Sequence, residues 1–164
     1  MTAAPGLPGI VRQEVPVLNA TVQVVWWQTV PGELLDAFTP YAEWMAKYSP
    51  RWLHRLVIEY DSNARAGSSL KVCADRAYCK ANVVLSPGWI DQDANARNWD
   101  AAHELVHIYA APVLHFVDGL RAYEWHGNAD VTAVRNQQYL YADEQMTEDL
   151  ARLLTLTLPP AVPR

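Results

Sequence analysis

The chain has 164 residues, of which 51% are hydrophobic and 19% are charged, and its formal net charge is −5. This length and composition are typical of one globular domain and exclude a mainly disordered chain. The acidic balance, without any run of Lys or Arg, argues against nucleic acid as a partner, and no apolar run approaches the ~20 residues of a membrane span. The N-terminus lacks the basic and apolar regions of a signal peptide, so we expect a cytoplasmic protein.

The two ends of the chain are predicted to lie outside the folded domain. Residues 1–13 contain two prolines and two glycines, a composition typical of a flexible segment. Residues 159–164 contain three further prolines and are expected to form a C-terminal tail. Residues 14–158 are therefore predicted to be a single domain.

The first half of the domain is predicted to hold a strand and a helix. Residues 15–30 are rich in valine and aromatic side chains, which favours a strand, although Pro16 interrupts its beginning. Residues 33–48 carry apolar side chains at intervals of three and four, the pattern of an amphipathic helix. Pro40 is expected to kink or divide this helix.

Three short β-rich segments follow, at residues 56–60, 70–73 and 81–85. The last two are expected to form a hairpin around the segment that carries Cys73 and Cys79. These are the only cysteines, and they lack the spacing of a zinc knuckle. In a reducing cytosol we expect both to be free thiols.

The C-terminal half is predicted to be helical. A helix is expected to begin near Asp93 or Asn95, either of which can cap it, and to lose its regular bonding near Pro112. Two further helices are predicted over 129–140 and 143–156. Together with the strands before them, these elements predict an α+β fold, with a small and mostly antiparallel sheet packed on helices.

The first of these helices carries His103-Glu104-Leu105-Val106-His107, the pattern H-E-x-x-H. Helical residues at i and i+4 lie on one face with Cβ atoms about 6 Å apart, so the two imidazoles can bind one ion. Glu104 then lies close enough to take a proton from a metal-activated water. The pattern predicts a Zn²⁺ site with His103 and His107 as ligands and Glu104 as general base.

A catalytic zinc site normally has three protein ligands and one open position, so a third ligand is required. His115 follows His107 by eight residues, and its use would require the chain to double back at once. His126 and Glu144, which follow His107 by 19 and 37 residues, remain as candidates on sequence alone.

The segment Glu144-Gln-Met-Thr147-Glu148-Asp-Leu150-Ala151, combined with His103 to His107, resembles the gluzincin arrangement of zincin metallopeptidases. The resemblance is distant and lies with small bacterial and phage members such as the ImmA/IrrE-type peptidases. In these the second helix often reads Glu-x-x-Ala-Asp/Glu-x-Phe/Leu-Ala, from which this chain departs at Thr147. It matches the pattern at Glu144, Glu148, Leu150 and Ala151.

The resemblance implies a minimal zincin-like fold in which Glu144 is the third zinc ligand. It also implies that Glu148 accepts the free N–H of a ligand imidazole and so fixes its tautomer. Zincins place a strand along the edge of the cleft, where a substrate adds as an extended strand. Residues 81–85, directly before the motif helix, are the expected cleft strand.

The expected function is that of a zinc metalloendopeptidase acting on a protein or peptide. One alternative is a SprT-like peptidase with His126 as third ligand, and another is a zincin-fold binding or regulatory protein without turnover. The intact Glu104 argues against the second alternative, because a purely structural metal site does not need that carboxylate. His126 is also a candidate for stabilising the oxyanion during hydrolysis.

Overall fold

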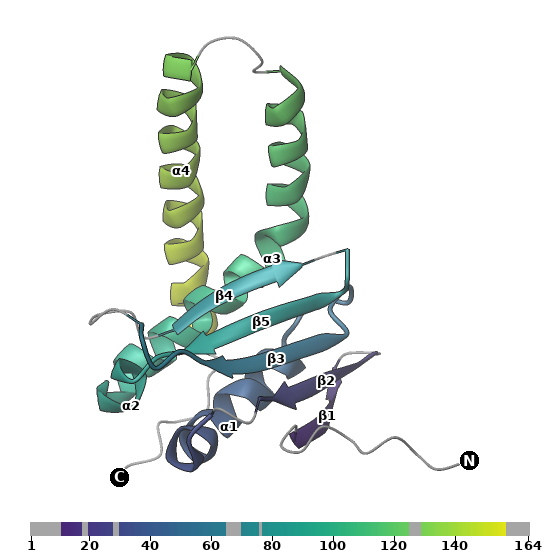
Figure 1. Cartoon of the computed structure of the whole chain (residues 1–164), viewed down its shortest axis with the longest axis vertical. Helices are drawn as coiled ribbons and strands as arrows, with labels where there is room; N and C mark the ends of the chain where they lie inside the picture. Colours follow the sequence, from purple (N-terminus) through teal and green to yellow (C-terminus); the bar gives the residue numbers. More distant parts are fainter. Residues whose placement is uncertain are drawn as a thin grey trace.

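The computed structural model describes residues 11–17, 20–27, 30–64, 70–75, 77–124 and 129–156. Strands and helices are mixed along the chain, which confirms the expected α+β class (Figure 1). In chain order they are β1 (Val11–Val17), β2 (Ala20–Trp26), α1 (Gly32–Lys47), β3 (Arg55–Tyr60), β4 (Leu70–Asp75), β5 (Lys80–Leu85), α2 (Gly88–Asp91), α3 (Ala94–Glu124) and α4 (Ala129–Thr155).

The strands form one five-stranded sheet in the order β1-β2-β3-β5-β4. The outer pairs β1–β2 and β4–β5 are antiparallel, whereas β2–β3 and β3–β5 are parallel. The sheet is therefore mixed, not mostly antiparallel as the sequence predicted. The reason lies in the connections. Helix α1 links β2 to β3 as a crossover, which makes this pair parallel, and β5 returns past β4 to pair with β3 in parallel, which leaves β4 at the edge of the sheet.

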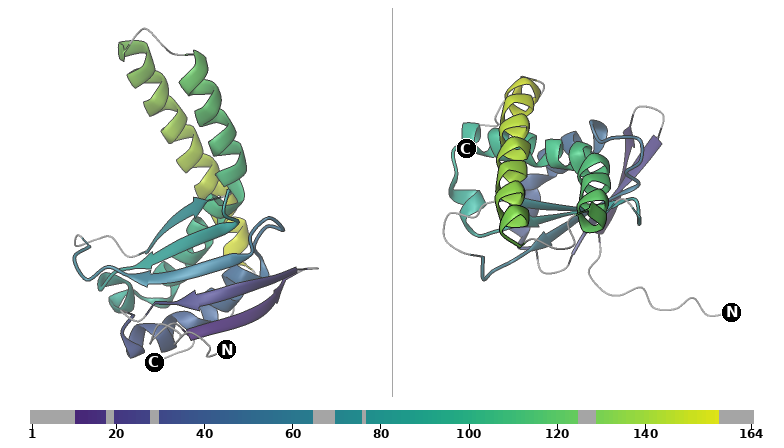
Figure 2. Two further views of the ribbon diagram at one scale, coloured as in Figure 1. Left: turned by 45° about the vertical axis from the view of Figure 1, so that its right-hand side comes forward. Right: turned by 90° about the horizontal axis from the view of Figure 1, so that it is seen from above.

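Helices α1 and α3 cover one face of this sheet (Figure 2). Strand β5 shows why: its side chains alternate, and Ala81, Val83 and Leu85 are buried under the helices. The ring of Phe38 in α1 packs edge-on against Trp26 and Trp89, with centroid separations of 6.2 and 5.0 Å. The resulting apolar core fixes α3 against the sheet.

The two long helices run past the points where the sequence predicted breaks. Helix α3 continues through Pro112 to Glu124, and the helices predicted over 129–140 and 143–156 are one element, α4. α3 and α4 pack against each other as a hairpin that projects beyond the sheet (Figures 1 and 2). This packing stabilises α3 and so offsets the loss of the backbone hydrogen bond that Pro112 cannot form.

Strand β1 begins at Val11, so residues 11–13 belong to the sheet and not to the predicted flexible segment. Pro16 is accommodated because β1 is an edge strand, where a missing N–H leaves no ladder bond broken inside the sheet. The rest of the predicted N-terminal segment and the predicted C-terminal tail lie outside the described residues. Within the described part of the chain, no helix combines the length and the apolar character needed to cross a bilayer.

Candidate metal centre

Helix α3 presents the motif residues to one side because its other side is held by the core. Leu105 and Val106 are buried, whereas His103, Glu104 and His107 are only half-buried. The helix start is capped as the sequence predicted, since Oδ1 of Asp93 accepts a hydrogen bond of 2.8 Å from the backbone N–H of Ala96. The cap and the core together fix the rotation of α3, and with it the direction of the three polar side chains.

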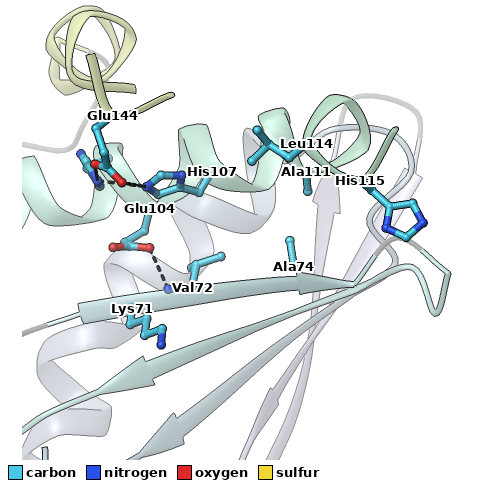
Figure 3. Close-up of a pocket in the computed structure, with 10 residues that line it drawn as sticks. Lys71, Val72, Ala74, Glu104, His107, Ala111, Leu114, His115 and Glu144 are labelled. Carbon is cyan, nitrogen blue, oxygen red and sulfur yellow. Dashed lines mark hydrogen bonds and ion pairs between the residues drawn. The ribbon is translucent and has the colours of Figure 1, made fainter. Parts of the chain in front are cut away.

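Helix α4 brings Glu144 to the same place (Figure 3). The Nε2 atoms of His103 and His107 lie 3.1 Å apart. Glu144 places Oε2 at 3.5 Å from Nε2 of His103 and Oε1 at 3.8 Å from Nε2 of His107. Three potential ligand residues from two helices therefore come together.

These separations fit a zinc ion. Ligands at 2.0–2.2 Å in a tetrahedron lie about 3.3–3.6 Å from one another. The distance between the two Nε2 atoms and the distance from each of them to its nearest Glu144 oxygen are 3.1, 3.5 and 3.8 Å, and the nearest oxygen differs for the two histidines. Among the described residues, His103, His107 and Glu144 are the group whose ligand atoms come together in this way, all within 4.8 Å. The Glu144 side chain is 53% exposed, so one side of the group stays open to a substrate.

The surroundings favour the metal-binding form of His107. Burial, together with the neighbouring His103, lowers the pKa of the His107 imidazole, which keeps the ring neutral at physiological pH. Its other nitrogen, Nδ1, lies 3.9 Å from Oδ2 of Asp143, a side chain that is only 10% exposed. Burial raises the pKa of the Asp143 carboxyl. Asp143 is the carboxylate next to Nδ1 of His107, at a distance that is longer than a hydrogen bond.

The resemblance implies that Glu148 accepts the free N–H of a ligand imidazole. Its side chain is half-buried on the next turn of α4. Within the described part of the chain it forms no hydrogen bond or ion pair with either histidine, and its assigned role stays a prediction. Nδ1 of His103 is buried and also lacks a hydrogen-bond partner there. Among the described residues, the structure therefore places a carboxylate near Nδ1 of His107 but none near Nδ1 of His103.

Glu104 faces the sheet edge. Its Oε2 accepts a hydrogen bond of 2.7 Å from the backbone N–H of Val72 in β4 (Figure 3). Burial raises the pKa of Glu104 to about 7, and the nearby carboxylates of Asp100 and Glu144 act in the same direction. The Val72 N–H and the Lys71 ammonium act against this rise. A carboxyl group with a pKa near neutrality is suited to accept and return a proton.

The open side of the group is a cleft of about 460 Å³ between α3 and β4. Its walls carry the three ligand candidates, Glu104, and residues further along both elements, namely Lys71, Val72, Ala74, Ala111, Leu114 and His115. The strand at the cleft is thus β4. The prediction that residues 81–85 form the cleft strand is wrong, because β5 is hydrogen-bonded to β3 on one side and to β4 on the other.

The structure brings His103, His107, Glu104 and Glu144 together at one cleft, and their roles there stay predictions. His115 lies two turns beyond His107 on the same helix and is not part of the ligand group, while His126 lies outside the described residues. Sequence reasoning missed Asp143, although its position directly before Glu144 was a usable signal. It predicted the strand at residues 70–73 but not that this strand, β4, forms the sheet edge at the cleft, which no signal in the sequence marks.

Comparisons with protein-family models, with curated proteins and with solved structures find no match to this chain.

Proposed function

We propose that this protein is a zinc-dependent endopeptidase. The observation that carries the proposal is the convergence of His103, His107 and Glu144 in a half-open cleft, with Glu104 beside them. A structural zinc site is normally closed by four protein ligands, whereas three ligands and an open side are typical of a catalytic one. Within the cleft a peptide carbonyl has room to approach the ligand group.

Each residue has a role that its surroundings support. The two imidazoles and the Glu144 carboxylate would hold a zinc ion, which when bound would polarise water and the substrate carbonyl. Glu104 takes the proton from the attacking water and returns it to the leaving amine. Asp143, whose Oδ2 lies 3.9 Å from Nδ1 of His107, would orient this ring in the metal-bound site and favour the tautomer whose Nε2 can bind the metal.

Strand β4 supplies the surface for an extended substrate. It is an edge strand, so alternate backbone groups point away from β5 and toward the cleft. Val72 and Ala74 both lie along the cleft wall and belong to this outward set. A peptide pairing with this edge would pass beside the ligand group with its backbone held by hydrogen bonds. The substrate class supported by this arrangement is an unfolded or extended segment of a protein.

The test combines metal analysis with cleavage of a peptide library read by mass spectrometry. The wild-type protein should bind one zinc ion per chain and cut peptides. Glu104→Gln should keep the zinc and lose a factor of about 10²–10⁴ in rate. Glu33→Gln, a change of the same kind at an exposed position on α1, is the matched control and should cut like wild type. A zinc-loaded wild type that cuts nothing in the library would contradict peptidase activity and favour a binding protein.

A further inference from the structure

A second cavity of about 410 Å³ lies at the far end of the cleft. It is lined by Trp52, His54, Ala77, Cys79 and His115, which come from the segment before β3, the turn between β4 and β5, and helix α3. The first two of these regions are tied together, since the carbonyl of Cys79 accepts hydrogen bonds from the backbone N–H groups of His54 at 2.8 Å and Arg55 at 3.1 Å. The cavity is therefore built on fixed backbone.

His115 belongs to the walls of both cavities, so the second cavity adjoins the metal cleft at this residue. Figure 3 shows the lining residues of the metal cleft along α3 and β4, with Glu104 and Lys71 at one end and His115 at the other. Eight residues of helix separate His107 from His115, which corresponds to about 12 Å. An extended peptide covers that distance with three or four residues.

The chemistry of the walls favours a planar apolar side chain. Trp52, His54 and His115 contribute three flat rings, and Cys79 contributes a polarisable thiol. The described residues that line the cavity include no Asp, Glu, Lys or Arg, so a Lys or Arg side chain entering it would meet no carboxylate there. An aromatic ring can stack on these walls and loses little conformational freedom on binding.

We propose that this cavity, termed here the ring pocket, binds an aromatic side chain of the substrate three or four residues from the cleaved bond. The inference rests on the proposed peptidase function, because the distance is counted from the ligand group. It adds a specificity determinant that lies outside the metal centre. Substrates should therefore be selected by an aromatic residue distant from the cut as well as by their extended shape.

The test uses octapeptides in which one Phe is moved along a Ser- and Gly-rich background, with Ser, Glu and Lys versions as comparisons. Cleavage by the zinc-loaded wild type is mapped by mass spectrometry, and kcat/KM should rise about tenfold when Phe stands three or four residues from the cut. The double variant His54→Ala/His115→Ala should lose this preference. So should Ala77→Trp, which fills the pocket from an exposed position. Tyr78→Ala, an exposed neighbour that does not line the pocket, is the matched control.

A second measurement separates this inference from the proposed function. Glu104→Gln protein with labelled histidines is titrated with the same peptides, and the imidazole signals of His54 and His115 are followed by NMR. The Phe peptide should shift both signals at about tenfold lower concentration than the Ser peptide. Such shifts without any cleavage by wild type would support the pocket and contradict the peptidase. Cleavage without a Phe preference, a preference for Glu or Lys, or a preference that survives both pocket variants would overturn the pocket.

Discussion

Glu104 and Val72 are joined by a hydrogen bond of 2.7 Å, in which the outward backbone N–H of the edge strand donates to Oε2 of the carboxylate. The proposed general base is therefore held by the strand that is proposed to bind the substrate. One outward amide of β4 is already used, so a peptide that pairs with the edge must either displace Glu104 or pair beyond Val72. The chemistry of the base and the binding of the substrate are coupled through this amide.

Val72→Pro removes this donor. Because the Val72 N–H lowers the pKa of Glu104, its loss should raise that pKa further above about 7. Proline is tolerated at an outward position of an edge strand, so the fold should persist. The measurement is a pH titration of the Glu104 side-chain carboxyl signal by ¹³C NMR in metal-free protein, with Glu104→Gln used to assign the signal.

Ala74→Pro is the matched control, since it removes the next outward N–H on the same strand. It should leave the pKa of Glu104 where it is in the wild type. Equal pKa values for Glu104 in Val72→Pro and in wild type would show that the hydrogen bond does not tune the carboxyl group.

The raised pKa of Glu104 also predicts how stability depends on pH in metal-free protein. The ordinary pKa of a glutamate is 4.5 and that of folded Glu104 is about 7, so the folded state holds this proton more tightly than the unfolded state. The stabilisation is complete below pH 4.5 and is lost as pH rises through about 7, with a total of about 3 kcal/mol. Chemical denaturation of wild type and Glu104→Gln at several pH values measures it.

The comparison with Glu104→Gln is needed because His107 acts in the opposite sense. Its pKa is lowered by burial, so it destabilises the fold as pH falls through the ordinary histidine value of 6.5. The difference in unfolding free energy between wild type and variant should fall steadily from pH 4.5 to above 7. A difference that does not change with pH would refute the raised pKa.

Zinc should stabilise the folded protein through all three ligands. At a free zinc concentration one hundred times the dissociation constant, binding adds about 2.7 kcal/mol, which corresponds to a rise in Tm of roughly 5–10 °C. Calorimetry should show this rise for wild type and for His54→Ala, whose imidazole is not among the ligands. His103→Ala, His107→Ala and Glu144→Ala should show little or none. A full rise without Glu144 would refute its assignment as third ligand.

Asp143 and Glu148 can be distinguished as partners of the ligand histidines. Because Asp143 lies beside Nδ1 of His107, Asp143→Asn should weaken zinc binding about 10–100-fold. Glu148→Gln also replaces a carboxylate by an amide further along α4, and it should change the zinc affinity only slightly. Competition with a zinc chelator measures both affinities. The reverse order of effects would favour the role that the resemblance gives to Glu148.

The sequence predicted the parts of the site that lie on one helix or follow a local pattern. The spacing of His103 and His107 placed both on one helical face, and the resemblance identified Glu144 for the third position. Asp93, which caps the helix, was one of the two candidate caps that the sequence offered, together with Asn95. These features depend on neighbours within a few residues, which is why a single sequence reveals them.

The features that it did not predict depend on distant contacts. β4 lies at the edge of the sheet because β3 pairs with β5, although β4 comes between them in the sequence. Nothing in residues 70–75 themselves indicates this pairing. Pro112 and the run after it look like a helix end when considered alone, but packing against α4 keeps α3 helical. The partnership of Asp143 with His107 likewise exists only once α3 and α4 lie side by side.

Asp143 and Glu144 are consecutive residues of α4, one directed to the outer nitrogen of His107 and the other to the ligand group itself. Each residue of an α-helix turns the chain by about 100°, so inserting or deleting one residue in α4 ahead of them would rotate both carboxylates away together. The proposed metal centre would then lose its third ligand candidate and the carboxylate beside His107 in a single event. A related chain that keeps the proposed site should therefore preserve the rotation of α4 relative to α3, even where individual side chains on the two helices differ.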